Sequence, residues 1–167
     1  MNILFIPIFA QIFNMKKILL IAVCILGTVS IASAQVIGFI KNTQSRITAN
    51  LDPIKAEWEK LLKDQGNEAV LTNFEIQSGA DRETGKTYYL LLATNRNKSI
   101  KVARGLLLKA GNLSFYKEEV KPFGIVVCSG CAGACAPDVS GGNWFCDSEC
   151  QIEGQKCTKS TTIDWID

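Results

Sequence analysis

The chain has 167 residues, 47% of them apolar, and it carries 18 Lys and Arg against 16 Asp and Glu. This length and composition suit one compact domain and exclude a disordered chain, which would be poor in apolar residues and strongly charged. The sequence contains no histidine. A Ser-His-Asp triad, a Cys-His dyad and a His-bearing zinc site are therefore excluded for this chain alone.

Residues 1–34 have the layout of a secretory signal. Read from Met15, two lysines precede an apolar run, and the small residues Ala-Ser-Ala end it. The cations hold the start in the cytosol, the apolar segment enters the membrane, and small residues fit the peptidase. We predict translation from Met15, cleavage between Ala34 and Gln35, and a secreted or periplasmic protein. The alternative is an uncleaved membrane anchor, but the apolar run is shorter than the roughly 20 residues of a usual span.

A helix is predicted to begin at Asp52, which we expect as the N-cap, with Pro53 in the first helical position. Gly66 is suited to close it. Spacings of i, i+4, i+7 and i+8 form one apolar stripe, which we expect to face the core: Ile54, Trp58, Leu61 and Leu62. The preceding segment, Val36–Asn50, is left open between a helical turn and a strand.

The period then changes to that of strands. Val70–Gln77 reads as a half-buried strand with Val70, Phe74 and Ile76 on one face. Thr87–Thr94 is a continuous apolar run, which predicts a central strand covered on both faces.

Three further strands are expected towards the C-terminus. Ser99–Lys109 alternates but is broken around Gly105, which indicates a bulge or a corner. Leu113–Lys117 and Gly124–Cys128 follow. The predicted fold is α+β: one amphipathic helix packed on a four- to five-stranded antiparallel sheet, followed by an irregular cysteine-rich C-terminal extension.

Six cysteines are concentrated near the C-terminus with the spacing C-x2-C-x3-C-x10-C-x3-C-x6-C: Cys128, Cys131, Cys135, Cys146, Cys150 and Cys157. The segment is rich in glycine and poor in large apolar residues, so crosslinks must supply its order. An even count in an oxidising compartment predicts three disulfides. Spacing does not choose among the fifteen possible pairings.

Two other uses of these cysteines stay open. Cys128, Cys131, Cys146 and Cys150 have a separation near that of four-cysteine zinc sites, and this alternative would lead if the protein were not exported. The sequence Cys128-Ser129-Gly130-Cys131 follows an apolar strand, as the C-x-x-C of thiol–disulfide oxidoreductases does, although a poor helix former comes after it.

The carboxylates offer weaker candidates. Asp81 and Glu83 are expected as solvated turn charges. Asp147 and Glu149 flank cysteines and suit a hard cation, but two carboxylates are too few for calcium, which takes six to eight oxygens.

We therefore predict three parts: a signal peptide (1–34), an α+β body (35–121) with a basic surplus, and a cysteine-rich extension (122–167) with an acidic surplus. Charges balance in the mature chain, so no global field attracts nucleic acid. The predicted function is that of an exported, disulfide-stabilised, non-enzymatic binding or structural protein without a cofactor. Its expected partner is a protein or cell-envelope component, and it meets a membrane only through an uncleaved signal.

Overall fold

The computed structural model describes residues 35–116, 124–131, 135–147 and 156–162. The predicted signal segment and Ala34 lie outside these ranges, and Gln35 is the first described residue. The described part is mostly β, and α2 (Asp52–Asp64) is its one helix. Its strands are β1 (Val36–Lys41), β2 (Gln44–Ile47), β3 (Leu71–Ala80), β4 (Thr87–Asn95), β5 (Ile100–Lys109), β6 (Asn112–Phe115), β7 (Ile125–Ser129), β8 (Ala136–Ser140), β9 (Asn143–Asp147) and β10 (Thr158–Thr162).

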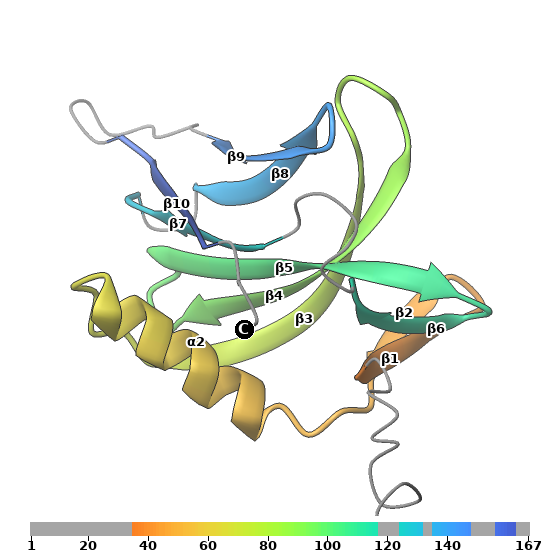
Figure 1. Cartoon of the computed structure of the whole chain (residues 1–167), viewed down its shortest axis with the longest axis horizontal. Coiled ribbons are helices and arrows are strands. Elements are labelled where there is room, and N and C mark those ends of the chain that lie inside the picture. The colour runs from red at the N-terminus through yellow and green to blue at the C-terminus, as the bar shows by residue number, and fades with distance from the viewer. Residues whose placement is uncertain (1–34, 117–123, 132–134, 148–155, 163–167) are drawn as a thin grey trace, which may run out of the picture. The chain divides into compact units, whose positions relative to one another are not determined.

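Eight strands form one antiparallel sheet, in the order β10-β7-β5-β6-β1-β2, with β4 paired to β5 and β3 paired to β4. The sheet curls until β2 approaches β3, where Ser45 Oγ donates to the carbonyl of Ile76 at 3.3 Å. α2 lies on one side of the central strands, and the separate two-stranded sheet β8–β9 lies on the other (Figure 1). The sheet is thus nearly closed and has a covering element on each face.

The predicted fold class is wrong. A helix on four or five strands with an irregular extension was expected, whereas this part of the chain contains a many-stranded, nearly closed sheet and one short helix. The extension is also regular: β7 and β10 join the main sheet, and β8 and β9 form a hairpin. Of these strands, the sequence predicted β7 as Gly124–Cys128. It did not predict β8, β9 and β10, because glycine turns and crosslinks rather than apolar alternation hold them.

The open segment Val36–Asn50 is largely a β-hairpin. Asn42 and Thr43 connect β1 to β2 with φ angles of 50° and 67°. A two-residue loop with both φ values positive matches the right-handed twist of paired strands. The pairing continues to Gly38 opposite Ile47. The polar sequence hid this hairpin because most of β2 is exposed.

The N-cap of the helix lies one residue before the predicted one. Leu51, not Asp52, is the N-cap residue, and it forms no side-chain cap bond. Asn50 takes that role instead, because its Oδ1 accepts the N–H of Asp52 at 3.0 Å. Pro53 lies in the first turn, as predicted, where its missing N–H is no loss.

Gly66 ends the helix as expected. Its φ is +79°, a left-handed value that glycine adopts without strain. Its N–H donates to the carbonyl of Lys63 at 2.9 Å, and the N–H of Asn67 donates to Leu62 at 2.8 Å. These two bonds make a Schellman motif and satisfy carbonyls at the helix end.

The predicted stripe of α2 faces the sheet. Ile54, Trp58 and Leu62 are buried, and the ring of Trp58 stacks on Phe74 with 6.0 Å between centroids. We call the cluster around them the helix-side core; its fully or nearly buried members are Ile37, Ile54, Trp58, Leu62, Leu71, Leu91, Ala93, Val102, Leu106, Leu113, Ile125 and Val127.

The central strand β4 is covered on both faces, as its continuous apolar run predicted. The neighbouring strands depart from expectation in detail. Val70 is 63% exposed and Leu71 is buried instead, because the register shifts between Leu71 and Asn73. The pairing register does not shift at Gly105. Instead, the part of β5 before Gly105 pairs with β7, and the part after it pairs with β6.

Candidate functional site: the cysteine-bridged hairpin

The second face of the central strands packs against the β8–β9 hairpin. Alternate residues of β4, β5 and β7 point here, because side chains in a strand alternate between the two faces. We call this cluster the hairpin-side core; its buried members are Leu90, Leu92, Ala103, Val126, Cys128, Cys131, Cys135, Val139 and Trp144. Three of these are cysteines, so sulfur fills part of this core beside large apolar side chains such as Leu90 and Trp144.

Disulfides tie the hairpin to the main sheet. Cys128 in β7 is bonded to Cys146 in β9, with Cα atoms 5.6 Å apart. Cys135, just before β8, is bonded to Cys157, just before β10, with Cα atoms 5.5 Å apart. Both spacings suit an ordinary bridge. Cys131 is disulfide-bonded as well. The protein is therefore disulfide-stabilised and cysteine-rich, as predicted.

These bonds bear on the alternative uses of the cysteines. Cys128 and Cys146, two of the four predicted zinc ligands, are joined to each other, and Cys150 lies outside the described residues. Cys128, the first thiol of the C-x-x-C pattern, is bonded to β9 and not to Cys131. A different group comes together: the Sγ atoms of Cys131, Cys135 and Cys157 lie within 4.8 Å of one another.

A buried carboxylate fixes the turn of the hairpin. Asp81, at the end of β3, is only 6% exposed. Its Oδ1 accepts the N–H groups of Glu83 and Thr84 at 2.9 and 2.8 Å, within its own loop. The N–H groups of Gly141 and Gly142, in the β8–β9 turn, donate to the same carboxylate at 3.1 and 2.8 Å.

These bonds also set the ionisation of Asp81. Backbone donation from Thr84 and Gly142, with smaller contributions from Glu83 and Gly141, holds the pKa of the Asp81 carboxyl far below its usual range. The carboxylate is therefore ionised at neutral pH and accepts bonds from two turns at once.

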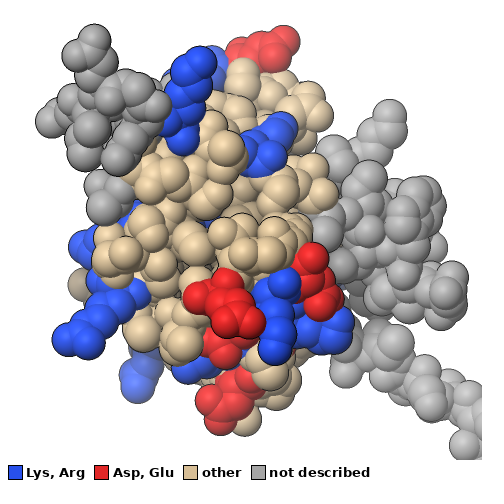
Figure 2. Space-filling view, turned by 90° about the vertical axis from the view of Figure 1, so that its left-hand side faces the viewer, with Lys and Arg blue, Asp and Glu red and all other residues tan. Residues whose placement is uncertain are grey.

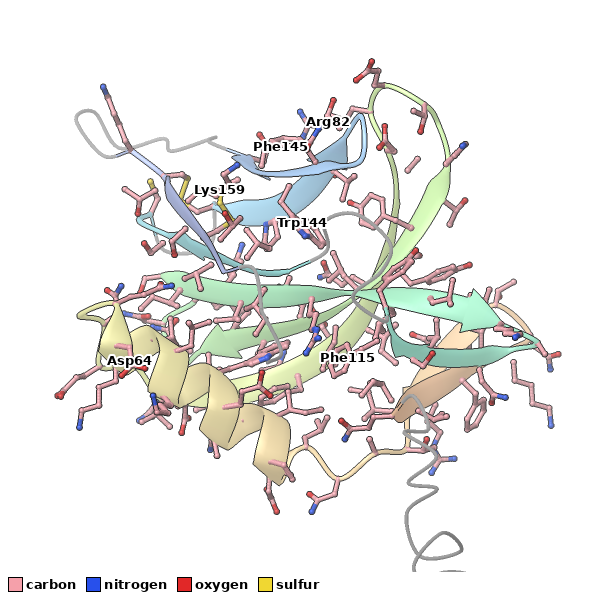
Figure 3. The ribbon with its side chains drawn as sticks, viewed as in Figure 1. Asp64, Arg82, Phe115, Trp144, Phe145 and Lys159 are labelled. Atoms are coloured by element: carbon pink, nitrogen blue, oxygen red, sulfur yellow. A yellow bond between two sulfur atoms is a disulfide. The ribbon has the colours of Figure 1, made fainter. Side chains whose placement is uncertain are left out.

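Arg82 attaches the hairpin beside this turn. Its Nε donates to Asp138 in β8 at 2.8 Å, and its Nη2 donates to Asp147 in β9 at 2.5 Å. The guanidinium also lies 4.5 Å from the ring centre of Phe145. Both side chains are labelled in Figure 3. The hydrogen bonds that Arg82 donates to Asp147, and then those to Asp138, raise the pKa of its guanidinium further.

Tyr88 completes the attachment from β4. Its hydroxyl donates to Asp138 Oδ1 at 2.7 Å. Burial, followed by this bond, raises the pKa of the Tyr88 phenol. Burial alone would raise the pKa of Asp138 too, but the bonds from Tyr88, the Val139 N–H and Arg82 outweigh it and lower that pKa. We call Asp81, Arg82, Tyr88, Asp138 and Asp147 the polar cluster.

Sequence reasoning missed this cluster. Asp81 was expected as a solvated turn charge, which is wrong because it is buried and accepts four N–H groups. Asp147, considered for a cation, is paired with Arg82; Glu149 lies outside the described residues. The order Asp81-Arg82-Glu83-Thr84-Gly85 is a turn signal in which aspartate bonds its own loop. The sequence around Asp81 does not indicate its other partners, Gly141 and Gly142, which lie some sixty positions away.

The fold and the site together define the class: a mostly β, disulfide-stabilised protein with a hairpin bonded onto the second face of its sheet. No protein family model, curated protein or solved structure matches the chain. Disulfides fit an extracellular or periplasmic compartment. Within the described ranges, no helix has the length and apolarity needed to cross a membrane.

Proposed function

We propose that the protein is exported and serves as a rigid, non-enzymatic binding or structural protein. One observation carries the proposal: the reactive side chains that the fold gathers around the β8–β9 hairpin are engaged in bonds that hold the hairpin in place. The cysteines are bridged, and the carboxylates are bonded to backbone N–H groups, to Arg82 or to Tyr88.

This arrangement supports a scaffold more than a catalyst. A general acid or base needs a pKa near the working pH. The pKa values of Asp81 and Asp138 are lowered and that of Tyr88 is raised, all away from neutrality. A nucleophilic cysteine needs a free thiolate, whereas Cys128 is bonded and fully buried.

The charge pattern supports a protein or cell-envelope component as the partner. Figure 2 shows basic and acidic side chains mixed on the face seen there, with uncharged residues between them. A nucleic-acid-binding surface would instead gather Lys and Arg on one face. Contact with a membrane is proposed only through a signal segment that stays uncleaved.

Intact-mass measurement of the protein recovered from the exported fraction tests the proposal. We expect a chain that begins at Gln35 and has lost two hydrogens for each disulfide. Thiol counting under denaturing, non-reducing conditions should find no free cysteine. The matched control is a chain started at Gln35 and kept in a reducing cytosol, which should show free thiols. Six free thiols in exported protein would overturn the proposal.

A zinc-binding protein is the second candidate, favoured by the proximity of the Cys131, Cys135 and Cys157 sulfurs. Zinc takes thiolates in tetrahedral sites, so this use requires the reduced protein. Elemental analysis of anaerobically purified protein tests it. About one zinc per chain would support this candidate, and a content well below that would remove it.

A further inference from the structure

Two disulfides of the hairpin-side core lie directly beside each other. The Sγ of Cys131 is within 4.8 Å of both sulfurs of the Cys135–Cys157 bridge, and Cys131 is itself in a disulfide. Cys131 and Cys135 are 3% and 1% exposed. The Cys128–Cys146 bridge is not part of this group.

Gly130 makes this close approach possible. A Cβ atom at this position would lie 3.0 Å from the Cys135 Sγ and 2.6 Å from the carbonyl oxygen of Lys156. Its φ of +143° is also one that other residues rarely adopt. Its N–H donates to the carbonyl of Ser99 at 3.1 Å, which anchors the turn to the start of β5. The backbone leading to Cys131 is thus held against the neighbouring bridge.

We propose that Cys131, Cys135 and Cys157 form a thiol–disulfide exchange site. An external thiolate, from a small thiol or a protein dithiol, first attacks the partner sulfur in the bridge of Cys131. A mixed disulfide forms between the external sulfur and that partner as the bridge breaks, and Cys131 leaves as a thiolate. The Cys131 thiolate then attacks Cys135 or Cys157. A new S–S bond forms as the Cys135–Cys157 bond breaks, and the released cysteine leaves as a thiolate. This internal step conserves electrons and exchanges one bridge for another.

The consequence of exchange falls on β10. Cys157 immediately precedes this edge strand, which pairs only with β7 in the described sheet. When Cys131 forms a disulfide with Cys135, Cys157 is released as a thiolate. The segment of β10 then loses its covalent link to the start of β8. The strand then keeps its pairing with β7 and the bond from Lys159 Nζ to the Trp144 carbonyl at 2.9 Å. Exchange thus turns a reducing signal into a weaker attachment of one edge strand.

This site differs from the C-x-x-C pattern seen in the sequence. There the attacking thiol would be Cys128 and its resolving partner Cys131. Here Cys131 attacks, and its targets come from the segments before β8 and β10. Cys128 stays bonded to Cys146 throughout.

The test removes one cysteine at a time. The two described bridges use four of the six cysteines that the sequence predicts to form three disulfides, and Cys150 lies outside the described residues. Cys150→Ala leaves five cysteines, of which the two described bridges use four, so the variant is designed to present Cys131 as the unmatched thiol. The folded variant is treated with N-ethylmaleimide and its disulfides are mapped by mass spectrometry. We expect label on Cys157 or Cys135 as well as Cys131, with Cys131–Cys135 or Cys131–Cys157 bonds present. The rate of their appearance should rise about tenfold per pH unit below the thiol pKa, because the thiolate attacks.

Cys146→Ala is the matched control. It frees Cys128, whose sulfur is outside the group, and label should stay on Cys128 alone. Label confined to Cys131, with Cys135–Cys157 intact, would overturn the proposal.

Parent protein treated with limiting dithiothreitol gives a second measurement that does not depend on a variant folding. Species with a Cys131–Cys135 or Cys131–Cys157 bond and an intact Cys128–Cys146 bridge are expected. Their absence at every time point would also overturn the proposal.

Discussion

The two faces of the central strands are covered by different means. On the helix side, large apolar side chains such as Trp58 and Leu62 are fully buried against the sheet. On the hairpin side, buried cysteines share the core with apolar side chains such as Leu90 and Trp144, and disulfides and the polar cluster hold the cover. β4 contributes to both, with Leu91 on the first face and Leu92 on the second.

The difference shows how one sheet can depend on two kinds of stabilisation. Apolar burial contributes in proportion to the area removed from water and is indifferent to redox conditions. A disulfide contributes mainly by restricting the unfolded chain, and only while it stays oxidised. We therefore expect the helix-side core to resist a reductant and the hairpin-side core to weaken.

The largest loss in the free energy of unfolding is expected from a substitution on the helix side. Trp58→Ala removes a fully buried ring that stacks on Phe74, and such a change costs about 3–5 kcal/mol. Urea unfolding with the disulfides intact measures the loss. Trp144→Ala is the comparison on the other face; it should cost less, because the Cys128–Cys146 bridge still holds β9. A greater loss for Trp144→Ala would reverse the assignment of the two faces.

Loss of one bridge should have the next largest effect. The double variant Cys135→Ala/Cys157→Ala removes a link across 22 residues, and we expect about 2–4 kcal/mol less stability. Urea unfolding of oxidised parent and variant gives the difference, and the same comparison in reductant is the control, since the gap should then close. Equal stability of the oxidised proteins would contradict the role given to this bridge.

Acid should weaken the hairpin side through Asp81. Its pKa is lowered in the folded protein, so the unfolded chain takes up the proton more readily. The resulting stability is complete above about pH 4, the usual pKa of aspartate, and is lost as the pH falls below it. Asp81→Asn should lower stability at neutral pH and flatten the acid dependence of the urea midpoint. Glu83→Gln, an exposed neighbour in the same loop, is the matched control. An unchanged acid profile in Asp81→Asn would refute this source of pH dependence.

The smallest effect is expected at the start of α2. Asn50→Ala removes the acceptor of the Asp52 N–H and should cost about 1 kcal/mol, as the loss of a helix cap does. Asp52→Ala should cost less, because Asp52 is not the cap. Thermal unfolding of both variants ranks them, and the opposite order would restore Asp52 as the capping residue.

Local patterns predicted the helix side well. Side-chain spacing within one segment predicted three features: the apolar stripe of α2, the end of α2 at Gly66, and the burial of β4 on both faces. The exact cap was missed because Asn50 and Asp52 are both good capping residues, and only geometry distinguishes them.

The hairpin side was less accessible to sequence reasoning. Its strands are short, and their neighbours are chosen by disulfides and by contacts such as Asp81 with Gly142, which join distant positions. Cysteine spacing predicted that crosslinks exist but not which cysteines meet. The curl of the sheet was missed for a related reason, because β2 is mostly polar and exposed and the β1–β2 turn lacks the usual glycine.

Hydrogen–deuterium exchange of the folded protein, with and without reductant, tests most directly whether sulfur holds the second face. We predict that reduction strips protection from the amides of β8, β9 and β10 while α2 and β3 keep theirs. Equal loss across all of these elements, or full protection of β8 and β9 after reduction, would contradict the account.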